Sequence, residues 1–189
     1  MINFRLFEEI KWLFIKKKLK KIKLLIFDVD GVLTDGYLLY DHQGNQLKRF
    51  NVKDGLGIRY LQKAGIFISI ISGGKEDVIL NRAKDLNIKH IYSCVKNKKE
   101  KVEILKKQFE IKTENILYVG DDLNDLPVKG SVGLLIAPND ASKGFKKFCD
   151  GILKNNGGFG AVRELAERLL RGTTLLKVIQ EEGFTENNY

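Results

Sequence analysis

This sequence of 189 residues lacks both a long apolar run and a cysteine framework. No apolar run approaches the length of about 20 residues that a membrane-spanning helix needs. The basic N-terminus is interrupted by Glu8, Glu9 and Lys11, unlike the continuous apolar core of a signal peptide. The two cysteines, Cys94 and Cys149, are too few for a disulfide scaffold or a zinc cluster, and neither lies in a CxxC pair. We therefore expect a protein of the reducing cytoplasm.

Internal repeats and low-complexity linkers are also missing, and the length suits one domain with a sizeable core. Hydrophobic residues make up 43% of the chain and charged residues 30%, a composition typical of a globular protein. The formal net charge of +9 comes partly from two lysine-rich stretches, at 11–23 and 96–101. Aromatic residues are not interleaved with these lysines as in nucleic-acid modules, so we expect no nucleic-acid partner.

Residues 1–21 are predicted to form a basic amphipathic helix. Its apolar residues recur near helical spacing, with lysines between them: Leu6, Phe7, Ile10, Leu13 and Phe14. We expect this helix to pack on the domain or on a neighbouring subunit. A membrane-surface helix is the alternative, because lysines beside Trp12 and Phe14 suit a lipid interface.

Residues 22–172 alternate between apolar runs and helical patterns. The runs, typical of strands buried on both faces, cover 24–27, 67–71, 116–119 and 132–136, with a shorter one at 90–92. Helical patterns cover 54–64, 75–86, 98–109 and 160–170. The alternation predicts an α/β fold of three layers, with a Rossmann-like parallel sheet between helices on both faces. Residues 36–51 read as a β-hairpin flap, and 173–189 as a mobile polar tail.

Polar side chains follow three of these strands and should meet at one edge of the sheet. Asp28 and Asp30 follow the first strand, and Ser72 follows the second. The third strand is followed by Asp121, Asp122, Asn124 and Asp125. Like charges at this density repel one another, and a hard divalent cation such as Mg²⁺ resolves the conflict.

This arrangement predicts phosphoryl transfer. An aspartate at a strand end, Asp28, can attack phosphorus and form a phospho-aspartate. Asp30 can act as general acid towards the leaving oxygen and then as general base towards water. Ser72 can hydrogen-bond the phosphoryl oxygens, and a lysine is needed to offset the negative charge of the transition state.

These motifs resemble those of the haloacid dehalogenase superfamily. The segment Asp-Val-Asp-Gly-Val-Leu-Thr-Asp-Gly at 28–36 matches the first motif, Ser72 the second, and Gly-Asp-Asp-Leu-Asn-Asp at 120–125 the fourth. Segments 50–59 and 157–164 are similar to those of the 3-deoxy-D-manno-octulosonate 8-phosphate phosphatases. The resemblance covers residues 23–170. It implies an enzyme of lipopolysaccharide precursor synthesis with no cap domain.

The resemblance also implies residue roles. Asp28 would be the nucleophile and a metal ligand, Asp30 the acid/base and a ligand through its backbone carbonyl, and Asp121 the third ligand. From their position after the third strand, Asp122, Asn124 and Asp125 are expected either to orient this metal shell or to cap the next helix. Lys98 is our choice for the third-motif lysine; Lys101 is its main rival, and Lys96 and Lys99 are also close. Substrate contacts are implied for Asp30, Asn51, Lys53, Asp54, Gly55, Arg59, Gly73, Arg82 and Lys98. The resemblance further implies a homotetramer in which a neighbour's hairpin covers the site.

Two positions depart from the phosphatase pattern. Gly74 replaces an arginine that often follows the second motif, and Phe159 replaces a charged residue of the Gly-Gly-x-Gly turn. A related nonulosonate 9-phosphate or another small sugar phosphate is therefore an alternative substrate. A non-catalytic regulatory or assembly subunit is an alternative of another class, although the intact Asp28 and Asp30 argue against it.

Overall fold

A six-stranded parallel sheet forms the centre of the protein. The computed structural model describes residues 2–74 and 77–183. The strand order is β5 (His90–Tyr92), β4 (Phe67–Ile71), β1 (Leu24–Phe27), β6 (Ile116–Val119), β7 (Leu134–Ala137) and β8 (Gly151–Ile152). All five strand pairs are parallel. The central β1 lies between β4 and β6, so the residues that follow these three strands meet at one edge.

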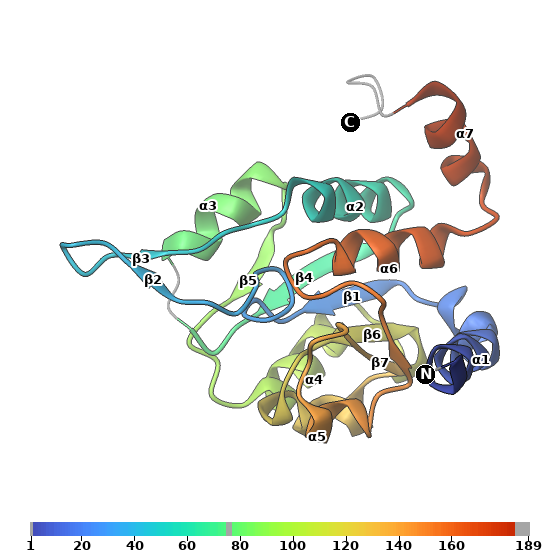
Figure 1. Cartoon of the computed structure of the whole chain (residues 1–189), viewed down its shortest axis with the longest axis horizontal. Helices are drawn as coiled ribbons and strands as arrows, with labels where there is room; N and C mark the ends of the chain where they lie inside the picture. Colours follow the sequence, from blue (N-terminus) through green and yellow to red (C-terminus); the bar gives the residue numbers. More distant parts are fainter. Residues whose placement is uncertain (1, 75–76, 184–189) are drawn as a thin grey trace.

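Helices cover both faces of this sheet, as the sequence predicts (Figure 1). One face packs against α2 (Val52–Lys63), α3 (Asp77–Asp85) and α6 (Ala161–Leu170). The other packs against α4 (Lys98–Gln108), the 3-10 segment η2 (Leu123–Ser131) and the short α5 (Lys143–Lys146). A second 3-10 turn, η1 (Thr113–Asn115), leads into β6. Alternate residues of β1 supply the two cores: Leu25 and Phe27 face one side, Leu24 and Ile26 the other.

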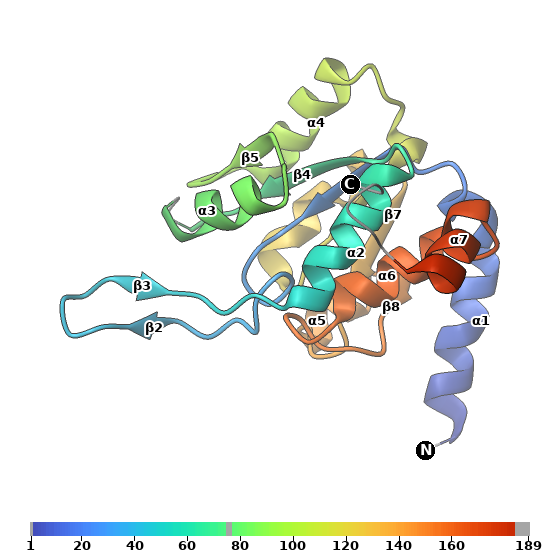
Figure 2. The same cartoon turned by 90° about the horizontal axis from the view of Figure 1, so that it is seen from above.

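The predicted hairpin is present as β2 (Leu39–Tyr40) and β3 (Gln46–Leu47). Its turn is held by Asp41, whose Oδ1 accepts the backbone N–H groups of Gln43 and Asn45 at 2.8 Å each. The hairpin projects away from the body of the protein in both views (Figure 2). The described part of the chain holds no second domain over the sheet, in agreement with the expected lack of a cap.

The N-terminal helix α1 (Ile2–Leu19) packs on the domain, but the side of the helix that is buried differs from the predicted one. Trp12, Ile15 and Leu19 are buried, whereas Leu13 and Phe14 are 69% and 81% exposed. Trp12 sets this orientation, because its indole Nε1 donates to the carbonyl oxygen of Ile152 in β8 at 3.0 Å. Leu6 and Phe7 lie in the helix, but their side chains are outside the described set. No helix in the described residues is long and apolar enough to cross a membrane.

The expectation of a mobile tail from residue 173 onward is wrong for its first part. Residues Thr174–Glu182 form α7, because Thr173 caps the helix by accepting the N–H of Leu176 at 3.2 Å. Ile179 then packs into the core at 7% exposure. Residues 184–189 lie outside the described part of the chain. The short β8 and α5 were also missed, since each has too few residues to show a period.

Candidate active site

The segment that follows β1, residues 28–36, carries the first motif and is called the catalytic loop. The backbone N–H of Asp28 donates to the carbonyl oxygen of Val119 at 2.9 Å, which continues the pairing of β1 with β6 by one residue. Asp121 follows β6 after Gly120. The parallel register therefore places Asp28 and Asp121 side by side, although 93 positions separate them in the sequence.

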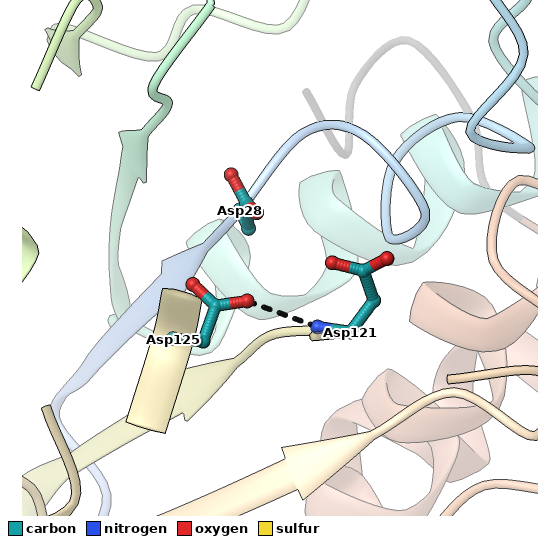
Figure 3. Close-up of side chains that lie close together, drawn as sticks. All are labelled: Asp28, Asp121 and Asp125. Carbon is teal, nitrogen blue, oxygen red and sulfur yellow. Dashed lines mark hydrogen bonds between the residues drawn. The ribbon is translucent and has the colours of Figure 1, made fainter. Parts of the chain in front are cut away.

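Three carboxylates meet at this point. Asp28, Asp121 and Asp125 each offer an oxygen within 4.8 Å of the others (Figure 3). Both oxygens of Asp125 are engaged by the protein: Oδ1 accepts the Tyr118 hydroxyl at 2.7 Å, and Oδ2 accepts the Asp121 N–H at 3.0 Å. These two hydrogen bonds, from β6 and the loop that follows it, fix the orientation of Asp125. Oxygen donors of this kind and spacing fit a hard divalent cation.

Burial and mutual repulsion shift the acidity of these groups. Burial, with the charge of Asp125, raises the pKa of Asp28 from an ordinary value of 3.8 to about 6. Burial, with the charge of Asp28, raises the pKa of Asp121 from 3.8 to about 7. Both shifts mean that the folded protein resists ionising these carboxyl groups. A bound cation would remove that resistance.

Lys98 is the lysine that points inward among the four candidates. Its ammonium is 2.8 Å from Asp28 Oδ2 and 2.6 Å from Asp125 Oδ1, and its side chain is 5% exposed. Burial by itself would lower the pKa of Lys98, but the charges of Asp28 and Asp125 outweigh that effect and raise it. Lys101 instead lies 4.3 Å above the Tyr92 ring, and Lys96 and Lys99 are exposed.

Asp30 has a partner that the sequence analysis missed. The Lys48 ammonium donates to both of its carboxylate oxygens, at 2.6 and 2.7 Å. Ser72 is buried nearby, and its Oγ accepts the Gly74 N–H at 3.0 Å. A Cβ on Gly74 would lie 3.4 Å from Ser72 Oγ and 3.6 Å from Asp30 Oδ2. The structure therefore brings the first and second motifs together, as expected.

Comparisons with known proteins agree with this geometry. Residues 91–165 match the family model of haloacid dehalogenase-like hydrolases. The chain is 42% identical over 153 residues to 3-deoxy-D-manno-octulosonate 8-phosphate phosphatase KdsC of Escherichia coli K12, a match that covers 81% of each chain. The chain belongs to this phosphatase family of the haloacid dehalogenase superfamily. It is a phosphatase.

Solved structures of this phosphatase family have the same fold. The enzyme of Yersinia pestis superposes with a TM-score of 0.83 at 37% identity, covering 86% of this chain and 88% of that one. The enzyme of Moraxella catarrhalis, solved with a magnesium ion, a phosphate ion and a KDO molecule, superposes with a TM-score of 0.84 at 35% identity. This second match covers 88% of this chain and 96% of the other.

In this phosphatase six of the nine predicted substrate residues line one of two cavities, and Lys53, Arg59 and Lys98 line neither. Asp30 and Gly73 line a cavity of about 600 Å³ between the hairpin and the β4–α3 loop. Asn51, Asp54, Gly55 and Arg82 line one of only about 10 Å³. The smaller cavity holds about one water molecule at most. Only the larger one has room for a sugar phosphate.

Several of these residues bind protein groups instead. The Asp54 carboxylate accepts the N–H groups of Gly160 and Arg163 at 3.1 and 2.8 Å, and so holds the start of α6. Burial nevertheless raises the pKa of Asp54. Arg59 donates to the carbonyl oxygen of Asp85 at 3.0 Å, and Arg82 to that of Asn51 at 3.2 Å. Contact of these residues with substrate stays a prediction.

Gly55 and Lys53 complete this set. A Cβ on Gly55 would lie 2.3 Å from the Arg82 guanidinium, so the glycine gives that side chain its room. Lys53 is exposed, and its N–H donates to Asn51 Oδ1 at 2.8 Å, a helix cap for α2. Asp122 likewise caps η2 through Leu123, and Asn124 is exposed.

The Gly-Gly-x-Gly turn packs directly on the catalytic loop. A Cβ on Gly157 would lie 1.8 Å from the carbonyl oxygen of Gly31, so only glycine fits there. Phe159, which follows in this turn, is 54% exposed. The guanidinium of Arg49 lies 5.4 Å from the centre of its ring, and the same group pairs with Asp35. Phe159 and Asp35 thus both contact Arg49, beside the loop that follows β1.

Proposed function

We propose that this phosphatase releases phosphate from 3-deoxy-D-manno-octulosonate 8-phosphate, with Mg²⁺ as cofactor. The observation that carries the proposal is the cluster of Asp28, Asp121 and Asp125 around Lys98 at the carboxyl edge of the sheet. A relative that superposes over most of its length was solved with magnesium, phosphate and KDO. The product would enter lipopolysaccharide precursor synthesis.

In the first step, Asp28 would attack phosphorus with a carboxylate oxygen. A bond forms between this oxygen and phosphorus, and the bond between phosphorus and the sugar oxygen breaks. Asp30 would give its proton to that leaving oxygen, so the sugar departs as an alcohol. Ser72 would hydrogen-bond the phosphoryl oxygens. Lys98 lies against Asp28 and would offset the negative charge that develops on the phosphoryl group.

In the second step, water would hydrolyse the phospho-aspartate. Asp30, now a carboxylate, takes a proton from the water as the water oxygen attacks phosphorus, and the bond to Asp28 breaks. Free phosphate leaves, and both aspartates return to their starting states. The residues that would hold the metal are Asp28 and Asp121 by side chain and Asp30 by backbone carbonyl. When bound, Mg²⁺ supplies positive charge beside the phosphoryl oxygens.

A related nonulosonate 9-phosphate is the second candidate substrate. Two observations favour keeping it: Gly74 offers no side chain to the large cavity, and an uncharged residue, Phe159, stands in the Gly-Gly-x-Gly turn with Arg49 beside its ring. Both features act on the sugar rather than on the phosphoryl group. They would alter the substrate and leave the reaction unchanged.

We further propose that the enzyme is a cytoplasmic homotetramer. The hairpin carries apolar side chains that are each more than half exposed: Tyr37, Leu38, Leu39, Tyr40 and Leu47. An apolar ribbon of this kind suits contact with another subunit. Its position beyond the end of the sheet fits a role in covering a neighbour's site.

The test is phosphate release across a panel of sugar phosphates, with Mg²⁺ and with a chelator. We expect turnover only with Mg²⁺ and highest kcat/KM for 3-deoxy-D-manno-octulosonate 8-phosphate. Preference for a nonulosonate 9-phosphate would support the second candidate. A lack of release from every phosphomonoester would favour a regulatory or assembly subunit.

A further inference from the structure

The contact between Lys48 and Asp30 joins the hairpin to the catalytic loop. Lys48 directly follows β3, and its ammonium lies 2.6 and 2.7 Å from the two oxygens of Asp30. The Lys48 side chain is only 3% exposed, whereas that of Asp30 is 38% exposed. The lysine therefore covers Asp30 from the hairpin side and leaves part of the carboxylate open to the large cavity.

This contact uses the same carboxylate as the proposed role of Asp30. To act on the leaving group, Asp30 must direct one oxygen towards the sugar oxygen of the substrate. Both oxygens accept from the Lys48 ammonium. Each oxygen has a second lone pair for the substrate, but turning towards the substrate would draw that oxygen away from the ammonium and weaken their hydrogen bond.

A buried ammonium that loses its partner needs another, because an unpaired buried charge is strongly unfavourable. The cavity of about 600 Å³ gives the substrate access to this ammonium, since Asp30, Lys48, Gly73 and Gly74 all line it. A Cβ on Gly74 would lie 3.9 Å from Lys48 Nζ, so glycine leaves space beside the lysine. The substrate brings anionic oxygens, on its phosphoryl group and on its sugar acid, into this space.

We infer that Lys48 is a positioning residue with two partners. It fastens the hairpin to Asp30, and it binds anionic oxygens of the substrate from its place in the lining of the large cavity. The inference rests on the proposed function. Lys48 therefore couples the position of the hairpin to the orientation of the Asp30 carboxylate in the same chain.

The test compares Lys48→Met with Lys48→Arg and with Lys107→Met, an exposed lysine of α4 that serves as the matched control. Hydrogen exchange of the hairpin amides is measured without substrate. KM and kcat are measured for p-nitrophenyl phosphate, which has no carboxylate, and for 3-deoxy-D-manno-octulosonate 8-phosphate. Methionine keeps the apolar length of the buried stem and removes the ammonium, with its charge and its hydrogen-bond donors.

We expect Lys48→Met to speed exchange in the hairpin and to raise KM about tenfold or more, with a smaller change in kcat, because a charge-assisted hydrogen bond is lost. Lys48→Arg should recover most of the KM, and Lys107→Met should match the wild type. A raised KM for both substrates assigns the second partner to the phosphoryl group. A raised KM for the sugar acid alone assigns it to the carboxylate.

An unchanged KM for both substrates in Lys48→Met would overturn the inference, as would unchanged exchange in the hairpin. A wild-type enzyme that turns over neither substrate would count against the proposed function instead. In that case the exchange measurement still tests whether Lys48 fastens the hairpin, so the two failures are distinguishable.

Discussion

Two charge clusters of this protein have opposite effects on acidity. In the active site, three carboxylates lie together and two of them, Asp28 and Asp125, pair with the buried Lys98, while the pKa of Asp121 rises to about 7. In the second cluster, Glu9 of α1 pairs with Arg168 at 3.0 Å and with Lys154 at 2.9 Å. Hydrogen bonds from Arg168 and Lys154 lower the pKa of Glu9 to about 2.

The difference lies in the balance of charge. The second cluster has two cations for Glu9 and Glu164, since Arg168 also bonds to Glu164 at 2.9 Å. Its ionised state is therefore favoured by folding. The active site keeps an excess of negative charge that its own residues do not offset. Such an excess is costly in a purely structural cluster and is useful where a cation and a phosphoryl group bind.

The strongest test of this contrast is Asp28→Asn. We expect kcat to fall about a thousandfold or more, because an amide is a poor nucleophile at phosphorus. We also expect a higher melting temperature without Mg²⁺, because one of the repelling carboxylates is removed. Phosphate-release assays and thermal melts check the two effects. Turnover at the wild-type level would contradict the proposed chemistry.

Replacing Lys98 should lower activity far more than replacing a nearby lysine of the same helix. We expect Lys98→Met to lower kcat/KM about a hundredfold or more, since the change removes the cation that, within residues 2–74 and 77–183, bonds to both Asp28 and Asp125. Lys101→Met is the matched control, because Lys101 contacts Tyr92 instead, and its kcat/KM should stay within about twofold of the wild type. Equal losses of kcat/KM in both variants would contradict the assignment of Lys98 as the lysine that stabilises the transition state.

The second cluster should respond in stability and not in activity. We expect Arg168→Met to lower the free energy of unfolding by about 1–3 kcal/mol, because two carboxylates lose their shared partner and the Trp12 ring loses a cation at 4.3 Å. Urea titration measures this change, with the exposed Arg171→Met as control. A lower kcat in Arg168→Met with an unchanged free energy of unfolding would contradict a purely structural role of the second cluster.

The smallest effect is a difference in pH dependence. Asp28 and Asp121 have raised pKa values in the fold, so their contribution to stability is greatest below about 4 and is lost as pH rises to about 7. Glu9 has a lowered pKa, so its contribution is present above its ordinary value of 4.5 and is lost as pH falls towards about 2. Unfolding titrations from pH 4 to 8 should therefore show falling stability without metal.

Adding Mg²⁺ should change this pH dependence of stability. Bound cation favours the ionised form of Asp28 and Asp121, so the fall in stability between pH 4 and 7 should shrink when Mg²⁺ is added. Asp121→Asn should reduce both the fall and the response to Mg²⁺. An identical pH profile with and without the metal would contradict a metal site at these carboxylates.

The sequence carried most of the active site. Asp28, Ser72 and Asp121 each follow an apolar run typical of a buried strand. Parallel strands bring their carboxyl ends together at one edge of the sheet. Lys48 gave no such signal. It is one of 33 basic residues, and only the return of the hairpin over the catalytic loop places it on Asp30.

The same limit applies to the buried face of α1 and to the protein contacts of the predicted substrate residues. The apolar residues of α1 lie on more than one face, so periodicity could not decide which face is buried until Trp12 met β8. Asp54 and Arg82 are placed beside each other by α2 and α3, where their polar atoms bind backbone groups of other segments. Spacing along the chain says nothing about such partners.

By itself the sequence determined five of the six strands of the main sheet, the layers and the aspartates at the strand ends, because these depend on local periodicity and on the position of a residue just after a strand. Only the tertiary structure decided which lysine meets which carboxylate, which face of α1 is buried, and where the cavity has room for a sugar. These depend on contacts between residues far apart in the chain, and the Coulomb energy of each contact depends on a distance that only the fold sets.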